Sequence, residues 1–433
     1  MSDAVAATST TEKLTTADGK PLKSALARSQ ARNRRRAFYL VLPLLLFVVV
    51  TFLIPIGQML SMSVTNTGFY FWKDRDTGET VPLMVELREW FDANPAGTEP
   101  DEAAYAALAA GLAHARDTKS IGQIGTRINY EVSGSRSMFT STARKAERME
   151  PPFKDAILDA DEEWADPKLW AAMRNASKSV TMDFYLAALD RTRDADGNIV
   201  KVEEERAVYV LLFQRTLILS ALITFLTLVL GFPIAHLLAT LPLSKSNLLM
   251  IFVLLPFWTS LLVRTTSWIV LLQSQGVVND IGVAAGLIAD ENRIQMIYNQ
   301  TGTIIAMTHI LLPFMVLPLY SVMRPIDPSY VRAARSLGAT SWTAFRRVYM
   351  PQTVPGIGAG GLLVFILAVG YYITPALVGG SSGQLISNLI AFHMQKSLNW
   401  SLAAALASLL LAGVLLLYWL YDRLVGIDNL KLG

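Results

Sequence analysis

The chain has 433 residues, of which 52% are hydrophobic and only 17% are charged, and its mean hydropathy is +0.37. This composition is too apolar for an ordinary water-soluble protein, and a net charge of +3 indicates no general affinity for nucleic acid. The lack of cysteine excludes disulfides, thiolate metal ligands and a cysteine nucleophile.

Residues 1–36 are rich in Ser, Thr and Ala and end in a basic cluster formed by Arg32, Arg34, Arg35 and Arg36. We expect a disordered cytoplasmic tail whose arginines set the topology of the segment that follows, with a nucleic-acid-binding arm as the alternative. The next apolar run is long and has no clear cleavage site. It therefore predicts a retained first membrane helix within residues 37–68 instead of a secretory signal.

Six apolar segments each come close to the ~20 residues that a helix needs to cross a bilayer. They cover about 38–60, 216–239, 248–272, 303–323, 354–377 and 401–420. The predicted fold class is an all-α polytopic membrane protein with six transmembrane helices. The last five lie in a permease-like region, 207–425, and a short cytoplasmic tail follows at 426–433.

An insert at 69–206 separates the first two apolar segments, is rich in charged residues and has the length of a small domain. Helical patterns cover 102–115, 152–158, 166–176 and 181–189, the third with Asp166 as its cap and Pro167 at its first position. We expect a mainly helical extracytoplasmic domain. It is either a structural cap or a ligand-binding domain, and no chemistry is assigned to it.

One stretch of the insert, from Asp194 to Gly197 with Glu203 beyond it, approximates the later positions of a calcium loop. Thr192 stands where that loop requires its first carboxylate. We therefore expect an Asp-Gly turn before a short strand at 198–202, and no metal site.

The third apolar segment carries Arg264 in its middle, where an arginine costs ~2.5–3.5 kcal/mol to insert. It should face a partner, the bundle interior or water. We predict a translocation pathway lined by this arginine and by nearby polar and aromatic residues, namely Trp258, Thr259, Arg264, Trp268, Tyr371 and Tyr372. The alternative is a snorkelling arginine that holds a structural hydrogen bond, with the other residues in packing roles.

The stretch 326–351 lies between the fourth and fifth apolar segments and predicts two short helices joined by a glycine turn. Asp327 can cap the first helix, and Pro328 suits its first position. Gly338 can stop this helix in a left-handed conformation, Thr340 or Ser341 can cap the second, and Pro351 follows its expected end.

Charge in the short loops sets the expected orientation. The loop 324–351 holds five arginines and one aspartate, whereas the loop 273–302 holds one arginine beside Asp280, Asp290 and Glu291. We therefore place the loop 324–351 and both termini in the cytoplasm. Further along, span five contains several glycines that allow a close helix approach, at a permease–permease interface, in a seam that moves during transport, or in ordinary tight packing: Gly356, Gly358, Gly360, Gly361 and Gly370.

Within 326–351, the order Arg-Ala-Ala, Gly-Ala, Phe, Val and Met-Pro resembles the EAA loop of binding-protein-dependent ABC importer permeases. Arg332 replaces the opening Glu of that pattern, and Met350 replaces its Leu. The resemblance implies a coupling helix that fits a groove on a cytoplasmic ATPase, with the contact formed by Arg332, Ala333, Ala334, Gly338, Ala339, Phe345 and Pro351. An ordinary cytoplasmic loop with capped helices is the alternative.

The stretches 255–273, 311–320 and 374–380 resemble the spermidine/putrescine type of these permeases. The resemblance implies a permease subunit in a bacterial inner membrane, forming the pathway for a polyamine. It also implies three kinds of partner: a cytoplasmic ABC ATPase dimer, a second permease subunit or a second copy of this chain, and a periplasmic solute-binding protein. No cofactor is implied.

The predicted spans contain no Asp or Glu that could bind a cation, so transport of another solute, whether amino-acid-like, anionic or ferric, is the alternative. No G-x-x-x-x-G-K-[ST] motif is present, so a separate subunit must hydrolyse ATP, and no nucleophile elbow indicates an enzyme. A stand-alone secondary transporter would usually show intramembrane acids or repeated halves. The four histidines lack metal-ligand spacing with each other: His114, His236, His309 and His393. His236 and His309 lie in or near spans, and we expect them to pack through hydrogen bonds.

Overall fold

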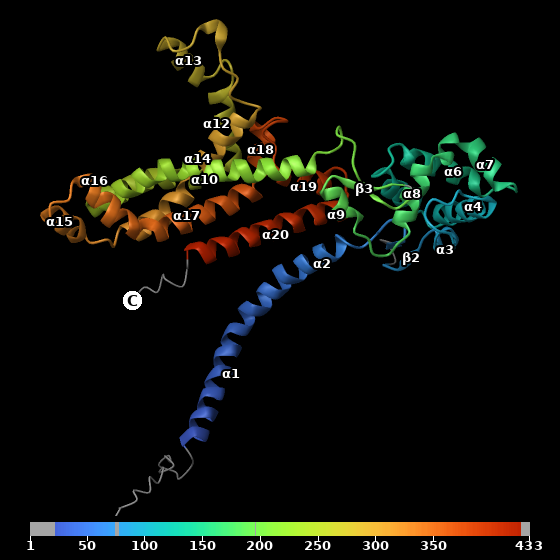
Figure 1. Ribbon diagram of the computed structural model, residues 1–433, viewed down its shortest axis with the longest axis horizontal. Coiled ribbons are helices and arrows are strands. Elements are labelled where there is room, and N and C mark those ends of the chain that lie inside the picture. Colours follow the sequence, from blue (N-terminus) through green and yellow to red (C-terminus); the bar gives the residue numbers. More distant parts are fainter. Residues whose placement is uncertain (1–21, 74–77, 195, 426–433) are drawn as a thin grey trace, which may run out of the picture. The chain divides into compact units, whose positions relative to one another are not determined.

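The computed structural model describes residues 22–73, 78–194 and 196–425, and nearly all of its regular structure is helical (Figure 1). Two compact units, Met1–Ser61 and Met62–Gly433, make up the chain. Among the described residues, five helices are long and apolar enough to cross a membrane, and a bent helix pair raises the number to six. The all-α polytopic fold expected from the sequence is confirmed.

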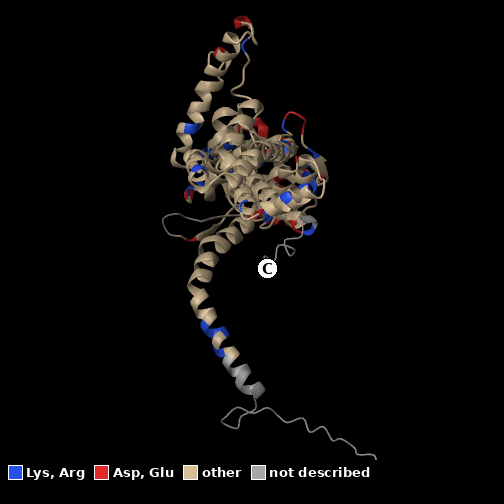
Figure 2. Ribbon diagram, turned by 90° about the vertical axis from the view of Figure 1, so that its left-hand side faces the viewer, with Lys and Arg blue, Asp and Glu red and all other residues tan. Residues whose placement is uncertain are grey.

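The first unit is a continuous helical stretch of three segments, α1 Leu22–Val48, the π-helical turn η1 Val49–Leu53 and α2 Ile54–Met62. Its basic cluster lies on α1 just before the uncharged part (Figure 2). The expected disorder is wrong for residues 22–36, because this stretch has no Gly or Pro and consists mainly of good helix formers. Residues 1–21 of the expected tail lie outside the described part.

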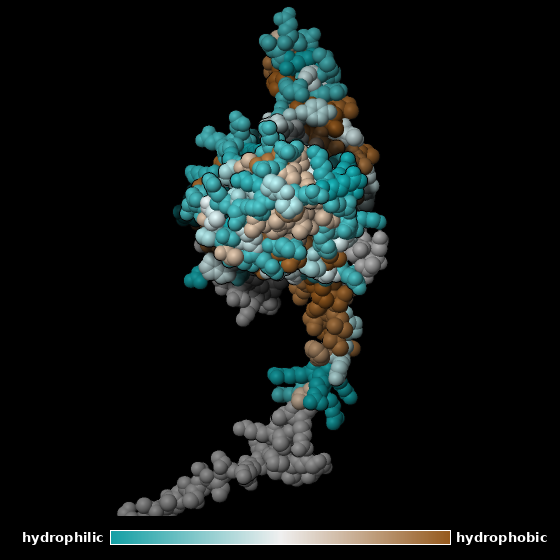
Figure 3. All heavy atoms as spheres, turned by 90° about the vertical axis from the view of Figure 1, so that its right-hand side faces the viewer, coloured by the Kyte–Doolittle hydropathy of each residue, from teal (hydrophilic) through white to brown (hydrophobic). Residues whose placement is uncertain are grey.

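The insert is a small helical domain with a hydrophilic surface (Figure 3). Fully buried side chains such as Leu108, Phe139 and Trp164 form its core. Its helices are α3 Val85–Ala93, α4 Glu102–Asp117, α5 Ile121–Asn129, α6 Ser135–Ala146, α7 Phe153–Ala160, the 3-10 turn η2 Glu162–Ala165, α8 Pro167–Ala176 and α9 Asp183–Ala188. Its two antiparallel hairpins pair β1 Phe71–Lys73 with β2 Thr80–Pro82, and β3 Arg191–Arg193 with β4 Ile199–Lys201.

The four helices predicted in the insert are confirmed as α4, α7, α8 and α9. The Asp166 side chain accepts a hydrogen bond from the Lys168 amide, and Pro167 opens α8 as expected. Helices α3, α5 and α6 were missed. In α6, Ser and Thr are weak helix formers, so packing against α4 and α5 decides the structure.

The Asp-Gly turn is also confirmed. One carboxylate oxygen of Asp194 accepts hydrogen bonds from the amides of Asp196 at 3.1 Å and Asn198 at 2.8 Å, and Gly197 has a φ of +86° between β3 and β4. This carboxylate caps a hairpin and is engaged by backbone amides.

The second unit also contains the remaining membrane helices. Helices α10 Tyr209–Thr240, α14 Gln300–Met323 and α17 Met350–Gly370 pack against one another, and α17 also contacts α20 Trp400–Val425. Buried side chains from the first three helices, including Ile223, Met315 and Val364, form one apolar core. The predicted second, fourth and sixth spans are confirmed with longer bounds.

The third predicted span is broken. Helix α11 Leu243–Trp258 meets the stretch Leu261–Ala284 at an angle of 96°. That stretch contains α12 Leu261–Leu272 and α13 Val277–Ala284. The backbone is extended at the two residues between the helices, and the Ser260 hydroxyl accepts from the Val263 amide to cap α12. A local N-cap therefore interrupts a continuous apolar sequence.

The fifth predicted span begins earlier and ends earlier than expected. A helix runs from α16 Ser341–Ala344 through the π-helical turn η4 Phe345–Tyr349 into α17. The expectation that Pro351 follows the helix end is therefore wrong. A π turn disturbs the regular bonding ladder, and a proline just after it has no N–H to leave unpaired. Beyond α17 lie α18 Ile373–Val378 and α19 Ile386–Gln395.

The insert is fixed to one end of the bundle. Phe184 and Ala188 of α9 share a buried cluster with Leu402 and Leu406 of α20. The Asp190 carboxylate accepts from the amides of Tyr209 at 3.0 Å and Val210 at 2.7 Å, at the start of α10. The insert therefore sits where α10 and α20 begin (Figure 1).

Candidate functional site

The stretch 326–351, called the coupling element below, has the predicted helix–glycine–helix structure. Its first helix is α15 Pro328–Ser336, and the Asp327 side chain accepts from the Ser329 amide at 2.8 Å. This backbone hydrogen bond is the main reason why the pKa of Asp327 lies below its usual value. The Thr340 hydroxyl accepts from the Thr343 amide at 3.2 Å and caps α16.

Gly338 has a φ of +92°, and a Cβ added there would meet no atom within 4 Å. Backbone conformation, and not lack of space, is therefore what favours glycine at this position. The element turns sharply between its helices, so both lie together at the end of the bundle where α10 finishes.

The outer surface of the coupling element is both apolar and basic. Leu337 is 90% exposed, Trp342 68% and Tyr330 55%. The one acidic residue of the element, Asp327, is exposed, and four exposed arginines surround the apolar side chains: Arg332, Arg335, Arg346 and Arg347. Large exposed apolar side chains with a charged surround are typical of a protein-binding surface.

The residues that the resemblance assigned to ATPase contact divide into two groups. Arg332, Ala333, Gly338 and Pro351 are exposed, whereas Ala334, Ala339 and Phe345 are half-buried. Phe345 packs against the bundle core. The exposed group can meet a partner, whereas Phe345 holds the element against its own chain.

The predicted pathway residues come together only in part. Trp268 of α12 donates through its indole N–H to Nδ1 of His309 on α14 at 3.2 Å. Arg264 lies near enough to affect both His309 and Tyr371 electrostatically. The buried Nε of Arg264 has no hydrogen-bond partner among the described residues. Trp268 and His309 thus join α12 to α14, with Arg264 one turn before Trp268 on α12 and Tyr371 directly after α17; these four residues are called the polar cluster below.

The remaining pathway candidates lie apart from this cluster. Trp258 is 71% exposed and makes no hydrogen bond or ring contact with the cluster in the described part of the chain. The Thr259 hydroxyl donates to the Pro256 carbonyl at the bend between α11 and α12, and Tyr372 is exposed. His309 was not grouped with the pathway candidates, because a lone histidine on an apolar helix indicates packing first.

The expected hydrogen-bonded packing role is confirmed for His236 and His309, and His393 has a similar contact that was not predicted. His309 accepts from Trp268, His236 Nδ1 lies 3.0 Å from the Tyr349 hydroxyl, and His393 Nε2 lies 3.0 Å from the Tyr209 hydroxyl. Each histidine ties together two helices or two segments that are distant in the sequence.

The glycines of α17 serve different neighbours. A Cβ at Gly356 or Gly360 would lie 3.1 Å or less from side-chain atoms of α14 and close to its backbone. One at Gly358 would clash with the Tyr421 hydroxyl of α20, whereas Gly361 and Gly370 have no atom nearer than 3.9 Å. Close helix approach is therefore confirmed at the first three positions.

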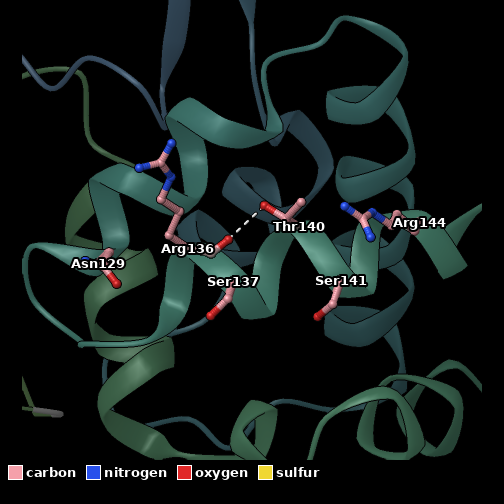
Figure 4. Close-up of a pocket in the computed structure, with 6 residues that line it drawn as sticks. All are labelled: Asn129, Arg136, Ser137, Thr140, Ser141 and Arg144. Atoms are coloured by element: carbon pink, nitrogen blue, oxygen red, sulfur yellow. Dashed lines mark hydrogen bonds between the residues drawn. The ribbon is translucent and has the colours of Figure 1, made fainter.

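A hollow of about 570 Å³ lies on the insert over α6 (Figure 4). Ser137, Thr140 and Ser141 line it, and their hydroxyls donate to carbonyls of their own helix or of the residue before it. Arg136 and Arg144 stand at its sides. Since the hydroxyl protons are already used, the two guanidinium groups and the Asn129 side-chain amide remain to donate, and the hollow gives no specific chemistry.

The family model "Binding-protein-dependent transport system inner membrane component" matches residues 221–426. The chain is 35% identical over 222 residues to the spermidine/putrescine transport system permease protein PotB of Escherichia coli K12, covering 51% of this chain and 80% of that one. It is 34% identical over 224 residues to PotB of Haemophilus influenzae, covering 52% and 78%.

A solved structure of a bacterial alginate ABC transporter in complex with an alginate-bound periplasmic protein is also similar. It has 18% sequence identity and a TM-score of 0.42, and the match covers 51% of this chain and 80% of that one. The family model and the extent of the match to the PotB proteins show that the chain belongs to the binding-protein-dependent inner membrane components, the permease subunits of ABC importers.

Proposed function

We propose that this permease carries a polyamine of the spermidine or putrescine type across the plasma membrane of a bacterium. The observation that carries the proposal is the 35% identity over 222 residues to permeases named for these solutes. Aromatic side chains such as Trp268 and Tyr371 can attract ammonium groups through their ring faces, at about 0.5–2 kcal/mol each.

One observation favours a second candidate. The buried Nε of Arg264 has no hydrogen-bond partner in the described part of the chain, and no Asp or Glu lies on the neighbouring spans α10, α14 and α17. An arginine whose Nε lacks an acceptor within the membrane could bind a carboxylate or another anionic group. An anionic or zwitterionic solute is therefore the alternative cargo.

The proposed energy source is a pair of cytoplasmic ATPase subunits that docks on the coupling element. The exposed Tyr330, Leu337 and Trp342, set among arginines, support this docking. The sequence carries no phosphate-binding G-x-x-x-x-G-K-[ST] motif, which agrees with a permease that does not itself hydrolyse ATP. A second permease, or a second copy of this chain, would complete the pathway, and a solute-binding protein would deliver the cargo.

The proposed orientation places the coupling element inside and the insert outside. Asp190 of the insert caps the start of α10, whereas Arg324, just before the coupling element, binds carbonyls at the end of α10. The two regions therefore lie at opposite ends of a span-length helix. Most of the chain's 35 acidic residues fall between 69 and 206, whereas the coupling element is basic, which agrees with the positive-inside rule.

In this arrangement ATP binding would draw the two ATPase subunits together and move the coupling elements with them. The bundle would shift between inward-open and outward-open states, because the nucleotide favours one of two existing conformations. The role of the permease is thus to bind, orient and release the solute while the ATPase supplies the free energy.

Docking is tested by co-purification of the ATPase with variants of the intact chain. Ala333 is exposed on α15, so Ala333→Phe should fold normally but block a closely seated partner. Ala103→Phe is the matched control, since Ala103 is an exposed helical alanine of the insert. We expect Ala333→Phe to lose the ATPase and Ala103→Phe to keep it. Retention of the ATPase by both variants would refute docking at this surface.

The cargo is tested in liposomes that contain the complete importer. ATP-dependent uptake of labelled spermidine and putrescine would support the polyamine assignment. Uptake of an acidic or zwitterionic solute, with none of either polyamine, would replace it with the second candidate. Uptake by this chain alone without an ATPase would contradict the importer mechanism itself.

A further inference from the structure

A row of aromatic rings runs from the surface of the coupling element into the bundle. Trp342 and Phe345 stack with their centroids 5.9 Å apart at 22°, and Phe345 and Tyr349 stack 5.8 Å apart at 23°. These three residues are called the aromatic ladder below. Trp342 is 68% exposed, whereas Tyr349 is 7% exposed, so the ladder connects the outer surface with the core.

The inner end of the ladder is joined to α10. The Tyr349 hydroxyl lies 3.0 Å from Nδ1 of His236, and the two rings meet edge to face with centroids 4.9 Å apart. Phe345 also meets the rings of His236 and Phe232 edge to face, at 6.2 and 6.1 Å. Phe345 and Tyr349 of the coupling element thus contact the last turns of α10.

The helix that carries the ladder has a special backbone here. Phe345 and Tyr349 are the first and last residues of the π-helical turn η4, and the Met350 amide donates to the Phe345 carbonyl. A π turn places successive side chains differently from an α-helix and is often found at functional sites. The turn brings both rings to one face, toward His236 and Phe232.

A second contact binds the same end of α10 and comes from Arg324, which directly precedes the coupling element in the sequence. Arg324 donates to the carbonyls of Ala239 at 2.7 Å and Leu241 at 2.9 Å. The end of α10 is thus bound just before the coupling element by Arg324 and near the end of that element by Tyr349. A displacement of the element would therefore reach α10 at two points.

We propose that the aromatic ladder, through the Tyr349–His236 hydrogen bond, transmits movement of the coupling element to α10. Tyr349 and His236 are positioning residues, because they act through α10 and not through contact with nucleotide or solute. The inference rests on the proposed docking of an ATPase at the coupling element. It adds a specific set of contacts through which movement at the docking surface would reach α10. A route of this kind has to be tested by measuring energetic coupling between its residues.

The test uses the complete importer, since this chain has no natural cysteine and accepts a single reporter cysteine. Leu222→Cys places the reporter on α10, at a position that is 39% exposed. Its rate of reaction with a maleimide is measured with and without a non-hydrolysable ATP analogue. ATPase co-purification is measured on the same samples.

The ladder variants are Tyr349→Phe, which removes only the hydroxyl, and His236→Leu, which removes the ring nitrogens. His236→Asn keeps a polar group near the position of Nδ1 and is the conservative rescue. Tyr320→Phe is the matched control, because the structure gives the Tyr320 hydroxyl no hydrogen bond among the described residues. All four carry the same reporter.

We expect the nucleotide-dependent change in labelling to fall by about three- to tenfold in Tyr349→Phe and His236→Leu, the size of one hydrogen bond. His236→Asn and Tyr320→Phe should keep most of the change. The double variant Tyr349→Phe/His236→Leu should be no worse than either single variant, since both remove one interaction.

The proposal would be overturned if the nucleotide-dependent change in labelling were as large in Tyr349→Phe and His236→Leu as in the otherwise unmodified importer. It would also be overturned by additive effects in the double variant, or by a reporter that does not respond to nucleotide in the otherwise unmodified importer. Loss of ATPase co-purification in Tyr349→Phe would also count against it, because the residue would then serve docking. Docking itself is judged separately by Ala333→Phe, so the two proposals can fail independently.

Discussion

The packing of α17 against α14 gives the sharpest stability prediction. A Cβ at Gly356 would lie 3.1 Å from Val322 Cβ, 3.3 Å from Leu319 Cα and 3.3 Å from the Pro318 carbonyl oxygen. Two of these three atoms belong to the backbone of α14, which cannot rotate away as a side-chain end can. Gly356→Ala should therefore force the two helices apart.

The expected magnitude follows from two opposing effects. Overpacking typically costs about 1–3 kcal/mol, whereas Gly to Ala inside a helix gains about 1 kcal/mol from propensity. Gly361→Ala is the matched control on the same helix, since its nearest neighbour would be Thr224 Cγ2 at 3.9 Å. Both variants share the propensity gain. Their free energies of unfolding should therefore differ by about 1–3 kcal/mol, or five- to 150-fold in the unfolding equilibrium constant.

The assay is reversible unfolding of the purified chain in detergent micelles, followed by tryptophan fluorescence. We expect Gly361→Ala to be as stable as the unmodified chain or more stable, and Gly356→Ala to be less stable than Gly361→Ala by the stated difference. Equal stability of the two variants would show that α14 and α17 are not in close contact at this point, and the packing argument would fail.

Three further predictions concern the two ends of the bundle. Asn66→Ala should destabilise the insert by about 1–3 kcal/mol for each buried group left unpaired. Asn66 accepts from Arg127 Nε at 2.7 Å and donates to the Asn175 carbonyl at 3.1 Å. Proteolysis of the insert should therefore be faster in this variant, but not in the exposed control Asn292→Ala. The lowered pKa of Asp327 means that its cap stabilises α15 above about pH 4 and is lost as pH falls through the folded pKa; amide exchange in 328–336 should show this pH dependence, and Asp327→Asn should remove it. Arg324→Met should speed amide exchange at the end of α10 by removing donors to Ala239 and Leu241, whereas the exposed Arg335→Met should not; equal exchange in both would contradict the contact.

The features that the sequence predicted well are local ones. Asp327, Gly338 and Thr340 each act within a few residues of themselves, through a cap or a backbone conformation, so their types alone indicate the helix–glycine–helix structure. The same holds for Asp166 and Pro167 at the start of α8. Long apolar segments also predicted the spans, because the bilayer requires them whatever the tertiary contacts.

The features that were missed depend on competition between signals. Ser260 caps α12 inside a continuous apolar run, so α11 and α12 form two helices instead of one. This bend separates Trp258 and Thr259 from Arg264, with which the sequence had grouped them. At Pro351 the preceding π turn outweighs the usual helix-ending effect of proline.

The candidate pathway was found in part for a similar reason. Arg264 and Trp268 stood out as unusual residues in an apolar segment, but His309 lies 41 positions further along the chain from Trp268, on another helix. Only the packing of α12 on α14 brings the two rings together. A single sequence does not show that two residues so far apart in the chain are in contact. The coupling element could be predicted because all of its residues lie in one continuous stretch.

In the proposed orientation the coupling element faces the cytoplasm while the insert faces outward. Because the chain has no cysteine, Arg335→Cys and Arg144→Cys can each be labelled alone with a membrane-impermeant maleimide. Both side chains are exposed, one on α15 and the other on α6. With this orientation, Arg144→Cys should react in intact cells and Arg335→Cys should react only in inverted vesicles; labelling of Arg335→Cys from outside intact cells would rule the orientation out.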